Sequence, residues 1–271
     1  MINFLLQTVG NHVRHDFVFE LEHAVDYHNW REPNSMGIYY SNLEDLDKLK
    51  GDEFIKTCIP VGTIEFVYKF IDTFIKPNGS KDIRPINVPE ELIEYEYSKR
   101  TIENVEFDNN SESRFEWYKW MRDYALLDVI FIKSNDIIKN SVNDFYKIND
   151  ILDKQLIPNG NYQISECINI VSEYRCFIYN DELKGIQYYS GDFTKFPDIN
   201  KIYDMLDVYN FNCSGVAPQA YTLDVAVTDN NDTVVIEVHE FFSCGLYGFN
   251  DYQVLPYMFK RVFDNIKKRI V

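Results

Sequence analysis

Two pairs of apolar segments, each joined by a short polar turn, constrain the fold of this chain more than any other feature of its sequence. Residues 174–179 and 184–189 flank an Asn-Asp turn, and residues 221–227 and 234–238 flank the turn Asp-Asn-Asn-Asp. Asn and Asp are common in tight turns because they tolerate the backbone angles that such turns need. The second half of the chain is therefore predicted to contain two antiparallel hairpins.

Helices and further strands are expected around these hairpins. Apolar residues in 129–133 and 162–168 indicate strands, and 254–270 has a helical period with Lys and Arg at its end, where they complement the helix dipole. In the first half we expect strands at 3–9 and 37–40, helices at 16–30 and 43–49, and an amphipathic helix opened by residues 62–63 that runs to residue 74. This combination predicts an α+β chain with a boundary near residue 123.

Charge and cysteine content limit the classes of partner. The 271 residues include 27 Lys and Arg against 43 Asp and Glu, a formal net charge of −16, so neither nucleic acid nor an anionic membrane is expected as the main partner. No apolar run has the roughly 18 residues of a membrane helix, and the first residues lack the features of a signal peptide. The five scattered cysteines form no C-x-x-C pair, so we expect a cytoplasmic location and neither a disulfide framework nor structural zinc.

Acidic residues interrupt the second hairpin on both of its strands. Asp224 lies between apolar residues on one strand, and Glu237 and His239, two positions apart, share a face of the other. A half-buried carboxylate is costly unless a cation lies beside it. Mg²⁺ binds carboxylate oxygens and bridges them to nucleotide phosphates, which would explain both acids. Alternatively, this face of the hairpin is an exposed edge and the carboxylates are solvated.

Three basic residues stand at positions where a simple core needs none. Lys133 closes the strand at 129–133 and Lys139 follows in the same short segment, so both could hold a polyphosphate. Arg175 follows Glu173 at the start of a strand and could stabilise charge on a transferring phosphoryl group. Each has a plainer interpretation, because Lys is normally exposed and Arg175 could form a structural ion pair with Glu173 or another acid.

The order of these elements resembles the C-terminal two-thirds of the ATP-grasp fold. Residues 163–168 are similar to its strand that meets adenine and ribose, and residues 173–178 to the Arg-bearing strand that follows. Residues 236–239 and 245–248 resemble the Glu-Val-Asn and Gly-Leu-x-Gly elements of the ribosomal-protein glutamate ligases. The resemblance runs from residue 129 to the C-terminus, with a weaker echo at 60–63. It is strongest to the ATP-grasp clade named for one arginine and two lysines, many of whose members are in phages and bacteria.

The resemblance implies an ATP-grasp domain at 123–271 behind an N-terminal α/β (pre-ATP-grasp) domain at 1–122. ATP would transfer its γ-phosphoryl group to a carboxylate of an amino acid or peptide, and an amine would attack the acyl phosphate. Arg175 and Lys139 would act in catalysis by neutralising charge. Mg²⁺ would be held by Asp224, Glu237 and His239. The nucleotide would be held by Lys133, Lys139, Glu166, Cys167, Ile168, Glu173 and Arg175.

One residue departs from the family pattern. His239 stands where many members carry an Asn that binds Mg²⁺, and a nitrogen ligand suits Mg²⁺ poorly. Mn²⁺ in place of Mg²⁺, or a contact of His239 with phosphate or substrate, is therefore left open. The departure also leaves open a second interpretation, in which the protein binds ATP but no longer catalyses ligation and serves as an interaction or regulatory module.

Other residues leave further alternatives open. Cys244 with His239 could act as a thiol nucleophile and base, although no third residue that would orient the histidine is apparent. The four histidines at positions 12, 15, 23 and 28 could bind a metal, but their irregular spacing favours scattered surface residues. Arg84 and Arg100 could each pair with a substrate carboxylate or form a structural ion pair.

Overall fold

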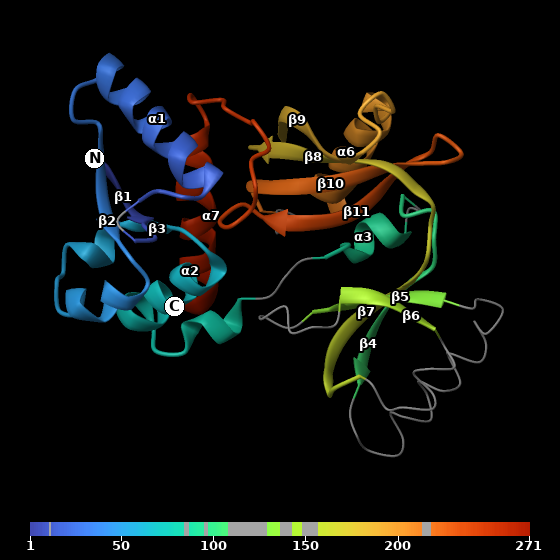
Figure 1. Cartoon of the computed structure of the whole chain (residues 1–271), viewed down its shortest axis with the longest axis horizontal. Coiled ribbons are helices and arrows are strands. Elements are labelled where there is room, and N and C mark those ends of the chain that lie inside the picture. Colours follow the sequence, from blue (N-terminus) through green and yellow to red (C-terminus); the bar gives the residue numbers. More distant parts are fainter. Residues whose placement is uncertain are drawn as a thin grey trace.

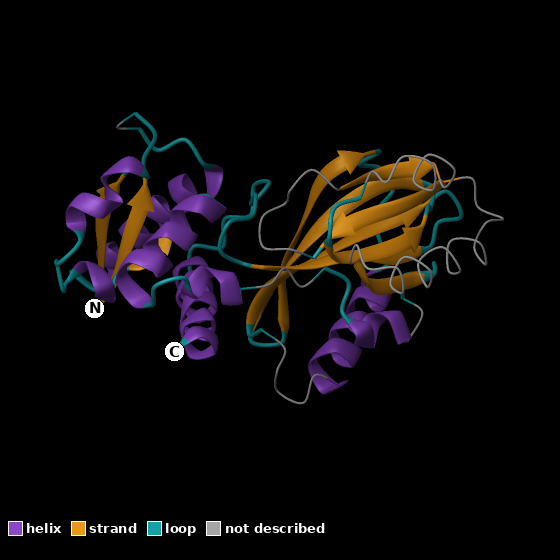
Figure 2. Ribbon diagram, turned by 90° about the horizontal axis from the view of Figure 1, so that it is seen from below, coloured by secondary structure: helices purple, strands orange, loops and turns teal. Residues whose placement is uncertain are grey.

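The computed structural model describes residues 1–10, 12–83, 87–94, 97–107, 129–135, 143–147, 157–212 and 218–271. These residues form one parallel and two antiparallel sheets, with helices packed on them (Figure 1). The parallel sheet and its helices lie at one end of the molecule and the antiparallel strands at the other (Figure 2). The predicted α+β class is confirmed. Within the described ranges, no helix is both long enough and apolar enough to cross a membrane.

The first part of the chain builds a three-stranded parallel sheet in the order β2-β1-β3. β1 (Ile2–Gln7) lies between β2 (Met36–Ser41) and β3 (Ile59–Val61). α1 (Asp16–Arg31) forms the crossover from β1 to β2 that a parallel pair requires. β1, β2 and α1 match the elements expected from the sequence, with ends shifted by one or two residues.

Short helical segments complete this part of the molecule. α2 (Ile64–Phe70) is capped by Thr63, whose hydroxyl accepts a hydrogen bond of 3.3 Å from the amide of Phe66. The apolar period predicts one helix to residue 74, but the chain widens after α2 into a π-helical turn, η3 (Ile71–Ile75). The remaining short helices are η1 (Glu44–Leu49), η2 (Ile55–Thr57), η4 (Gly79–Asp82) and α3 (Glu90–Glu94).

Both predicted hairpins are confirmed, and together they form one antiparallel sheet in the order β11-β10-β8-β9. The first hairpin turns at Asn180 and Asp181, which have left-handed φ values of 49° and 64°. Two consecutive left-handed residues match the twist of the flanking strands. α6 (Ile199–Asn212) shares a hydrophobic core with this sheet. The four strands are β8 (Ile170–Tyr179), β9 (Glu182–Gly191), β10 (Ala220–Thr228) and β11 (Thr233–Glu240).

The second antiparallel sheet has the order β4-β7-β5-β6. The strand expected at 162–168 begins earlier, as β7 (Gly160–Glu166), so Cys167 and Ile168 follow the strand. Gln163 of β7 ties this sheet to the segment before it, because its side-chain amide donates to the carbonyl of Val88 (3.0 Å) and accepts from the backbone amide of the same residue (3.1 Å). The other strands are β4 (Ile102–Phe107), β5 (Val129–Ser134) and β6 (Asn143–Lys147).

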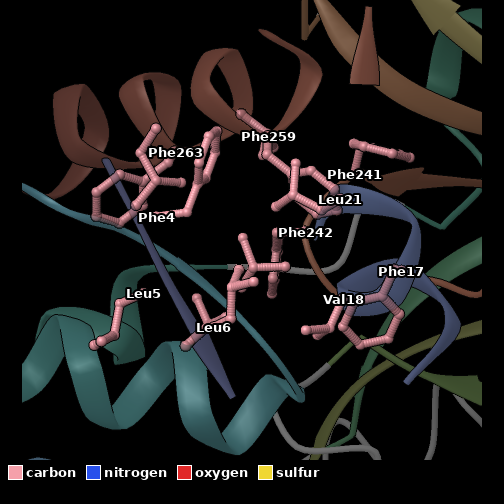
Figure 3. Packing of buried hydrophobic residues seen from close by; sticks show 14 of the residues in the cluster. Phe4, Leu5, Leu6, Phe17, Val18, Leu21, Phe241, Phe242, Phe259 and Phe263 are labelled. Carbon is pink, nitrogen blue, oxygen red and sulfur yellow. The ribbon is translucent and has the colours of Figure 1, made fainter. Parts of the chain in front are cut away.

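One hydrophobic core joins the two ends of the chain. α7 (Leu255–Ile270) turns its apolar face to the parallel sheet, and its side chains are buried with those of β1 and α1 (Figure 3). The ring centroids of Phe263 in α7 and Phe70 in α2 lie 6.0 Å apart. The C-terminal helix was predicted at this position, but its partner was not.

Elements on each side of the expected division at 122/123 pack against elements from the other side. β4, from the N-terminal side, pairs with β7 from the C-terminal side. α7, from the C-terminal side, shares the core of the N-terminal sheet. The division itself falls in residues 108–128, outside the described residues. The apolar face of α7 is buried against the parallel sheet and its helices, and the division into two domains at 122/123 stays a prediction.

A cavity with a charged wall between two antiparallel sheets

A cavity of about 370 Å³ lies between the two antiparallel sheets. Six of the residues that the sequence assigned to the nucleotide or the metal lie on its wall, whereas Arg175, Asp224 and His239 do not line it. Lys139 and Arg84 lie outside the described residues. The wall is formed by Arg100, Phe131, Lys133, Phe145, Ser165, Glu166, Cys167, Ile168, Ile170, Glu173, Tyr189, Ile236 and Glu237.

An ion pair between the two sheets crosses this cavity. Lys133, the penultimate residue of β5, pairs with the Glu237 carboxylate on β11. Their side chains are only 12% and 14% exposed, so both charges are largely removed from water. Lys133 therefore lies near the end of a strand, on the cavity wall and beside Glu237. Its role toward a phosphate stays a prediction.

A row of charged residues runs across the neighbouring sheet behind this pair. Arg175, Asp224 and Glu237 are register partners on β8, β10 and β11. Register partners in antiparallel strands present their side chains on the same face, about 5 Å apart. The row therefore places two carboxylates side by side, with Arg175 at one end and Lys133 reaching the other.

Asp224 is bound by Arg175 through both carboxylate oxygens. Nε of Arg175 donates to Oδ1 at 2.8 Å and Nη2 donates to Oδ2 at 2.7 Å, while Nη1 donates to the carbonyl of Gly245 at 3.1 Å. Burial by itself lowers the pKa of Arg175, but the hydrogen bonds and charge of Asp224 raise it above the ordinary value. Arg175 stays a cation at every accessible pH. The ion pair anticipated as the plainer interpretation is present, with Asp224 instead of Glu173.

Two tyrosines that the sequence analysis did not select cover this arginine. The guanidinium carbon of Arg175 lies 5.7 Å from the ring centroid of Tyr189 and 5.3 Å from that of Tyr247. The two rings stack on each other at 5.2 Å. The Tyr189 hydroxyl donates to Glu173 at 3.0 Å, which links the row to the cavity wall. Tyr247 occupies the variable position of the Gly-Leu-x-Gly element at 245–248, whereas Tyr189 belongs to no motif and is identified only by its position on β9.

Tyr247 adopts a left-handed backbone conformation, with φ of 50°. A Cβ atom added at Gly245 would lie 3.0 Å from the Tyr247 ring, so glycine allows this ring to lie close to the loop backbone. The amides of Leu246 and Tyr247 also donate to Asp16 at the start of α1, at 2.7 and 3.4 Å. The glycine loop is thereby fixed to the N-terminal helix as well as to the arginine.

The segment expected to meet adenine and ribose lines the cavity at the end of β7. Glu166 exchanges two hydrogen bonds with the start of β4, because its carboxylate accepts from the amide of Thr101 at 2.8 Å and its own amide donates to the carbonyl of Thr101 at 3.1 Å. Cys167 follows, with a pKa raised by burial. The protein itself thus holds the Glu166 carboxylate in place on the cavity wall.

The predicted metal ligands do not converge as a set of three. Among the described residues, no group of three or more His, Cys, Asp and Glu side chains is placed to hold a metal ion. His239 Nδ1 lies 2.8 Å from the carbonyl oxygen of Glu240. The adjacent carboxylates of Asp224 and Glu237 nevertheless have the hard oxygen donors that Mg²⁺ prefers. As oxygen donors they would suit a divalent ion.

Two alternatives lose support. Cys244 is 6% exposed, and burial raises the pKa of its thiol to about 12, so a thiolate nucleophile is not available near neutral pH. In two of the four histidines of the first half, a ring nitrogen lies within hydrogen-bond distance of a backbone carbonyl oxygen. His23 lies 2.9 Å from the carbonyl oxygen of Phe19, and His28 lies 2.9 Å from that of Tyr252.

Solved structures with the same fold include the ATP-grasp ligase PsnB, with a TM-score of 0.52 at 9% identity (98% of this chain and all of the other covered). The D-cycloserine synthetase DcsG superposes with a TM-score of 0.59 at 10% identity, covering 99% of this chain and all of the other. The macrocyclase MdnC of Microcystis aeruginosa MRC, solved with its precursor peptide MdnA, has a TM-score of 0.51 at 10% identity (97% and 99% covered). The D-alanine–D-alanine ligase of Bacillus anthracis has a TM-score of 0.51 at 12% identity (99% of both chains). At such identities the likeness shows the fold alone.

The sequence comparison defines the family. No curated protein matches the chain. The model that matches is an ATP-grasp domain, family 2 of the clade named for one arginine and two lysines, and it covers residues 98–257, more than half of the 271 residues. This range contains the described strands of both antiparallel sheets and every residue of the cavity wall. The chain therefore belongs to family 2 of this ATP-grasp clade.

Proposed function

We propose that the protein is an ATP-dependent carboxylate–amine ligase that acts on an amino acid or peptide through an acyl phosphate. The observation that carries this proposal is the charged wall of the cavity, where Lys133 meets Glu237 beside the segment Glu166–Ile168. A nucleoside triphosphate with its metal ion suits a cavity whose wall has a cation, a carboxylate and the end of a strand. No side-chain nucleophile is needed for such a reaction, since positioning and electrostatics supply the catalysis.

The proposed roles follow the position of each group. Lys133 and Lys139 would contact the phosphates, and Arg175 would neutralise charge on the transferring group. Cys167 and Ile168 would meet the base. Glu166 and Glu173 would contact the nucleoside. Asp224 and Glu237, with His239 as a weaker ligand, would hold Mg²⁺ or Mn²⁺, and the ion when bound supplies charge neutralisation at the phosphates.

The reaction proceeds in two displacements. A carboxylate oxygen of the substrate attacks the γ-phosphorus of ATP, the bond from that phosphorus to the bridging oxygen breaks, and ADP leaves. The amine then attacks the carbonyl carbon of the acyl phosphate. The C–N bond forms, inorganic phosphate leaves with the electron pair of the C–O bond, and the amine loses a proton.

The substrate class rests on similarity to other enzymes. Structures with this fold include an ATP-grasp ligase complexed with a minimal precursor and a macrocyclase bound with a precursor peptide. They also include a D-alanine–D-alanine ligase, whose name gives an amino acid as its substrate. We infer an amino acid or peptide as the substrate here, without a particular amino acid. A cytoplasmic location is part of this proposal.

A second candidate is an ATP-binding module without ligase activity. Two observations favour it: both oxygens of Asp224 are bound by Arg175, and His239 stands where a better oxygen ligand is common in the family. In this arrangement a metal competes with Arg175 for each oxygen of Asp224, which weakens the metal site. The two candidates differ in turnover, not in ATP binding.

The test uses hydroxylamine as a substitute for the unknown amine. The full chain is incubated with ATP, Mg²⁺ and pools of amino acids or short peptides, with ADP formation followed and hydroxamates identified by mass spectrometry. The key variant is Glu237→Gln, which removes the charge at nearly constant shape. Glu182→Gln is the matched control, because Glu182 is an exposed carboxylate on β9 that pairs with Lys184, away from the cavity wall.

The expected result is ADP formation that depends on one pool, with the matching hydroxamate, in the parent and in Glu182→Gln. Glu237→Gln should remain folded and lose turnover. ATP binding without carboxylate-dependent ADP formation in any pool would favour the second candidate. If Glu237→Gln keeps full activity per folded molecule, the site is misplaced.

A further inference from the structure

The peptide group between Gly245 and Leu246 connects two charged side chains from distant parts of the chain. Its amide, the N–H of Leu246, donates to Oδ2 of Asp16 at 2.7 Å, and its carbonyl, the C=O of Gly245, accepts from Nη1 of Arg175 at 3.1 Å. Asp16 is the first residue of α1, 230 positions from Leu246. One planar unit of the glycine loop therefore lies between a carboxylate of the N-terminal helix and the arginine of the charged row.

The hydrogen bond from Asp16 determines where the carbonyl of this peptide points. A trans peptide group is rigid and directs its N–H and its C=O to opposite sides, so fixing the amide also fixes the carbonyl. Gly245 has no Cβ atom, and the backbone angles that orient this peptide plane therefore have a wide allowed range. The side chain of Leu246 is fully buried, which fixes the place of the loop but not the orientation of the plane. A directional anchor is needed for that.

The carboxylate of Asp16 provides this anchor through more than one bond. Oδ2 also accepts from the amide of Tyr247 at 3.4 Å, and Oδ1 accepts from the amide of Phe17 within α1 at 2.8 Å. The two oxygens thus accept from backbone amides of both the loop and the helix. Hydrogen bonds from an amide to a carboxylate are stronger than those to a neutral acceptor, so this side chain holds the loop more firmly than a neutral one could.

Both contacts that Arg175 makes with the loop depend on this anchor. Its guanidinium binds Asp224 with Nε and Nη2, and its central carbon lies 5.3 Å from the ring centroid of Tyr247. A fork on one carboxylate can still rock about the axis that joins the two groups, and the bond from Nη1 to Gly245 stops this motion. The N–H donors of a guanidinium lie in one rigid plane, so the contacts together set the direction of every donor.

We propose that Asp16 is a positioning residue for the ligation, which acts on Arg175 through the peptide between Gly245 and Leu246. The inference rests on the proposed function, in which Arg175 neutralises charge on the transferring phosphoryl group. In this role Asp16 contacts neither nucleotide nor substrate. Its removal should lower kcat, because a small misplacement of a group that stabilises the transition state slows the reaction. It should not change ATP binding, which the proposed function assigns to the cavity wall.

The experiment uses the full chain with the substrate pool that supports ADP formation, and it measures kcat, the KM for ATP and thermal unfolding. Asp16→Ala removes every contact of the carboxylate, whereas Asp16→Asn keeps one acceptor oxygen. Asp26→Asn is the matched control, because it removes the same charge from an exposed residue of the same helix. Arg175→Lys keeps a cation beside Asp224 but lacks the donor that reaches Gly245, and it is combined with Asp16→Ala.

Asp16→Ala is expected to lower kcat per folded molecule by about ten-fold or more, with the KM for ATP unchanged. Asp16→Asn should fall between Asp16→Ala and the parent, and Asp26→Asn should match the parent. In the Arg175→Lys background Asp16→Ala should have a much smaller effect on kcat, since residues that act as one unit give non-additive losses. The amide of Leu246 should exchange with deuterium faster in Asp16→Ala, because its acceptor is lost.

The outcomes also separate this inference from the proposed function. If the parent forms ADP and Asp16→Ala keeps the parental kcat per folded molecule, only the role of Asp16 fails, and a loss of stability alone makes it a helix cap. Equal losses of kcat with and without Arg175→Lys would also overturn the inference, because Asp16 would then act by another route. If Asp16→Ala does not fold, Asp16→Asn against Asp26→Asn decides in the same way. If the parent forms no ADP with any pool, both fail.

Discussion

Replacing Asp224 with Asn is expected to destabilise the fold strongly, because it leaves the charge of Arg175 buried without an anion. The two side chains are joined by hydrogen bonds of 2.8 and 2.7 Å and are only 9% and 2% exposed, with Arg175 given first. Asn keeps the shape and one acceptor oxygen but not the charge. Breaking a buried pair by removing one partner costs about 3–5 kcal/mol, and we expect a loss in the free energy of unfolding within this range.

An exposed pair in the same chain provides the reference. Asp204 and Lys201 on α6 are 3.6 Å apart with side chains about half exposed, at 52% and 54%. Asp204→Asn should cost about 0–1 kcal/mol, as is usual for surface ion pairs. The difference between the two Asp→Asn variants therefore measures what burial adds.

Urea denaturation with linear extrapolation provides the measurement, with the slope m compared between variants to detect a change in the unfolded state. The double variant Arg175→Met/Asp224→Asn should lose less stability than the sum of the single variants, because it removes the uncompensated charge. If Asp224→Asn costs no more than Asp204→Asn, the buried pair is not a stabilising unit, and the arrangement of the charged row must be reconsidered.

Three further predictions concern phosphate, metal and pH. Lys133→Met should lower the ATP affinity by about ten-fold, measured by calorimetry, while adenosine binding stays constant. ATP should bind only with a divalent ion, because Asp224 and Glu237 otherwise repel it; equal affinity in EDTA would contradict the metal assignment. Burial raises the pKa of Glu240 although Arg269 pairs with it. The folded state therefore holds this proton to higher pH than the unfolded state, so stability falls as pH rises between the two pKa values. Glu240→Gln should remove that slope in urea titrations from acidic to neutral pH and stabilise the protein at neutral pH.

The structure gives the positions of the predicted site residues but not their roles. The sequence placed Lys133, Glu166, Glu173 and Glu237 near one another only through the resemblance to the ATP-grasp fold, and the structure brings all four to one cavity wall. Their contacts with ATP stay predictions. Lys139 lies outside the described residues, so its proposed role depends on the binding experiments alone.

Local sequence determined both hairpins and the position of Asp224 opposite Glu237. A strand alternates its side chains with a period of two, and an Asn-Asp turn can be recognised from two residues, so a few neighbouring residues contain the whole signal. The same is true of the amphipathic period of α7, whose ends were predicted to within one residue. These features depend on interactions between residues that are close in the chain, and the sequence lists them directly.

Tertiary structure alone decided which of these faces and charges meet. Lys133 pairs with Glu237, 104 positions away, because packing brings β5 opposite β11. Arg100 reaches Val235, 135 positions away, and α7 is buried against a sheet formed by the first residues of the chain. The sequence around a charged residue does not identify its ion-pair partner, because any carboxylate can pair with any basic side chain. An apolar helix face likewise fits any apolar surface of similar size, and only the packing of the whole chain selects one.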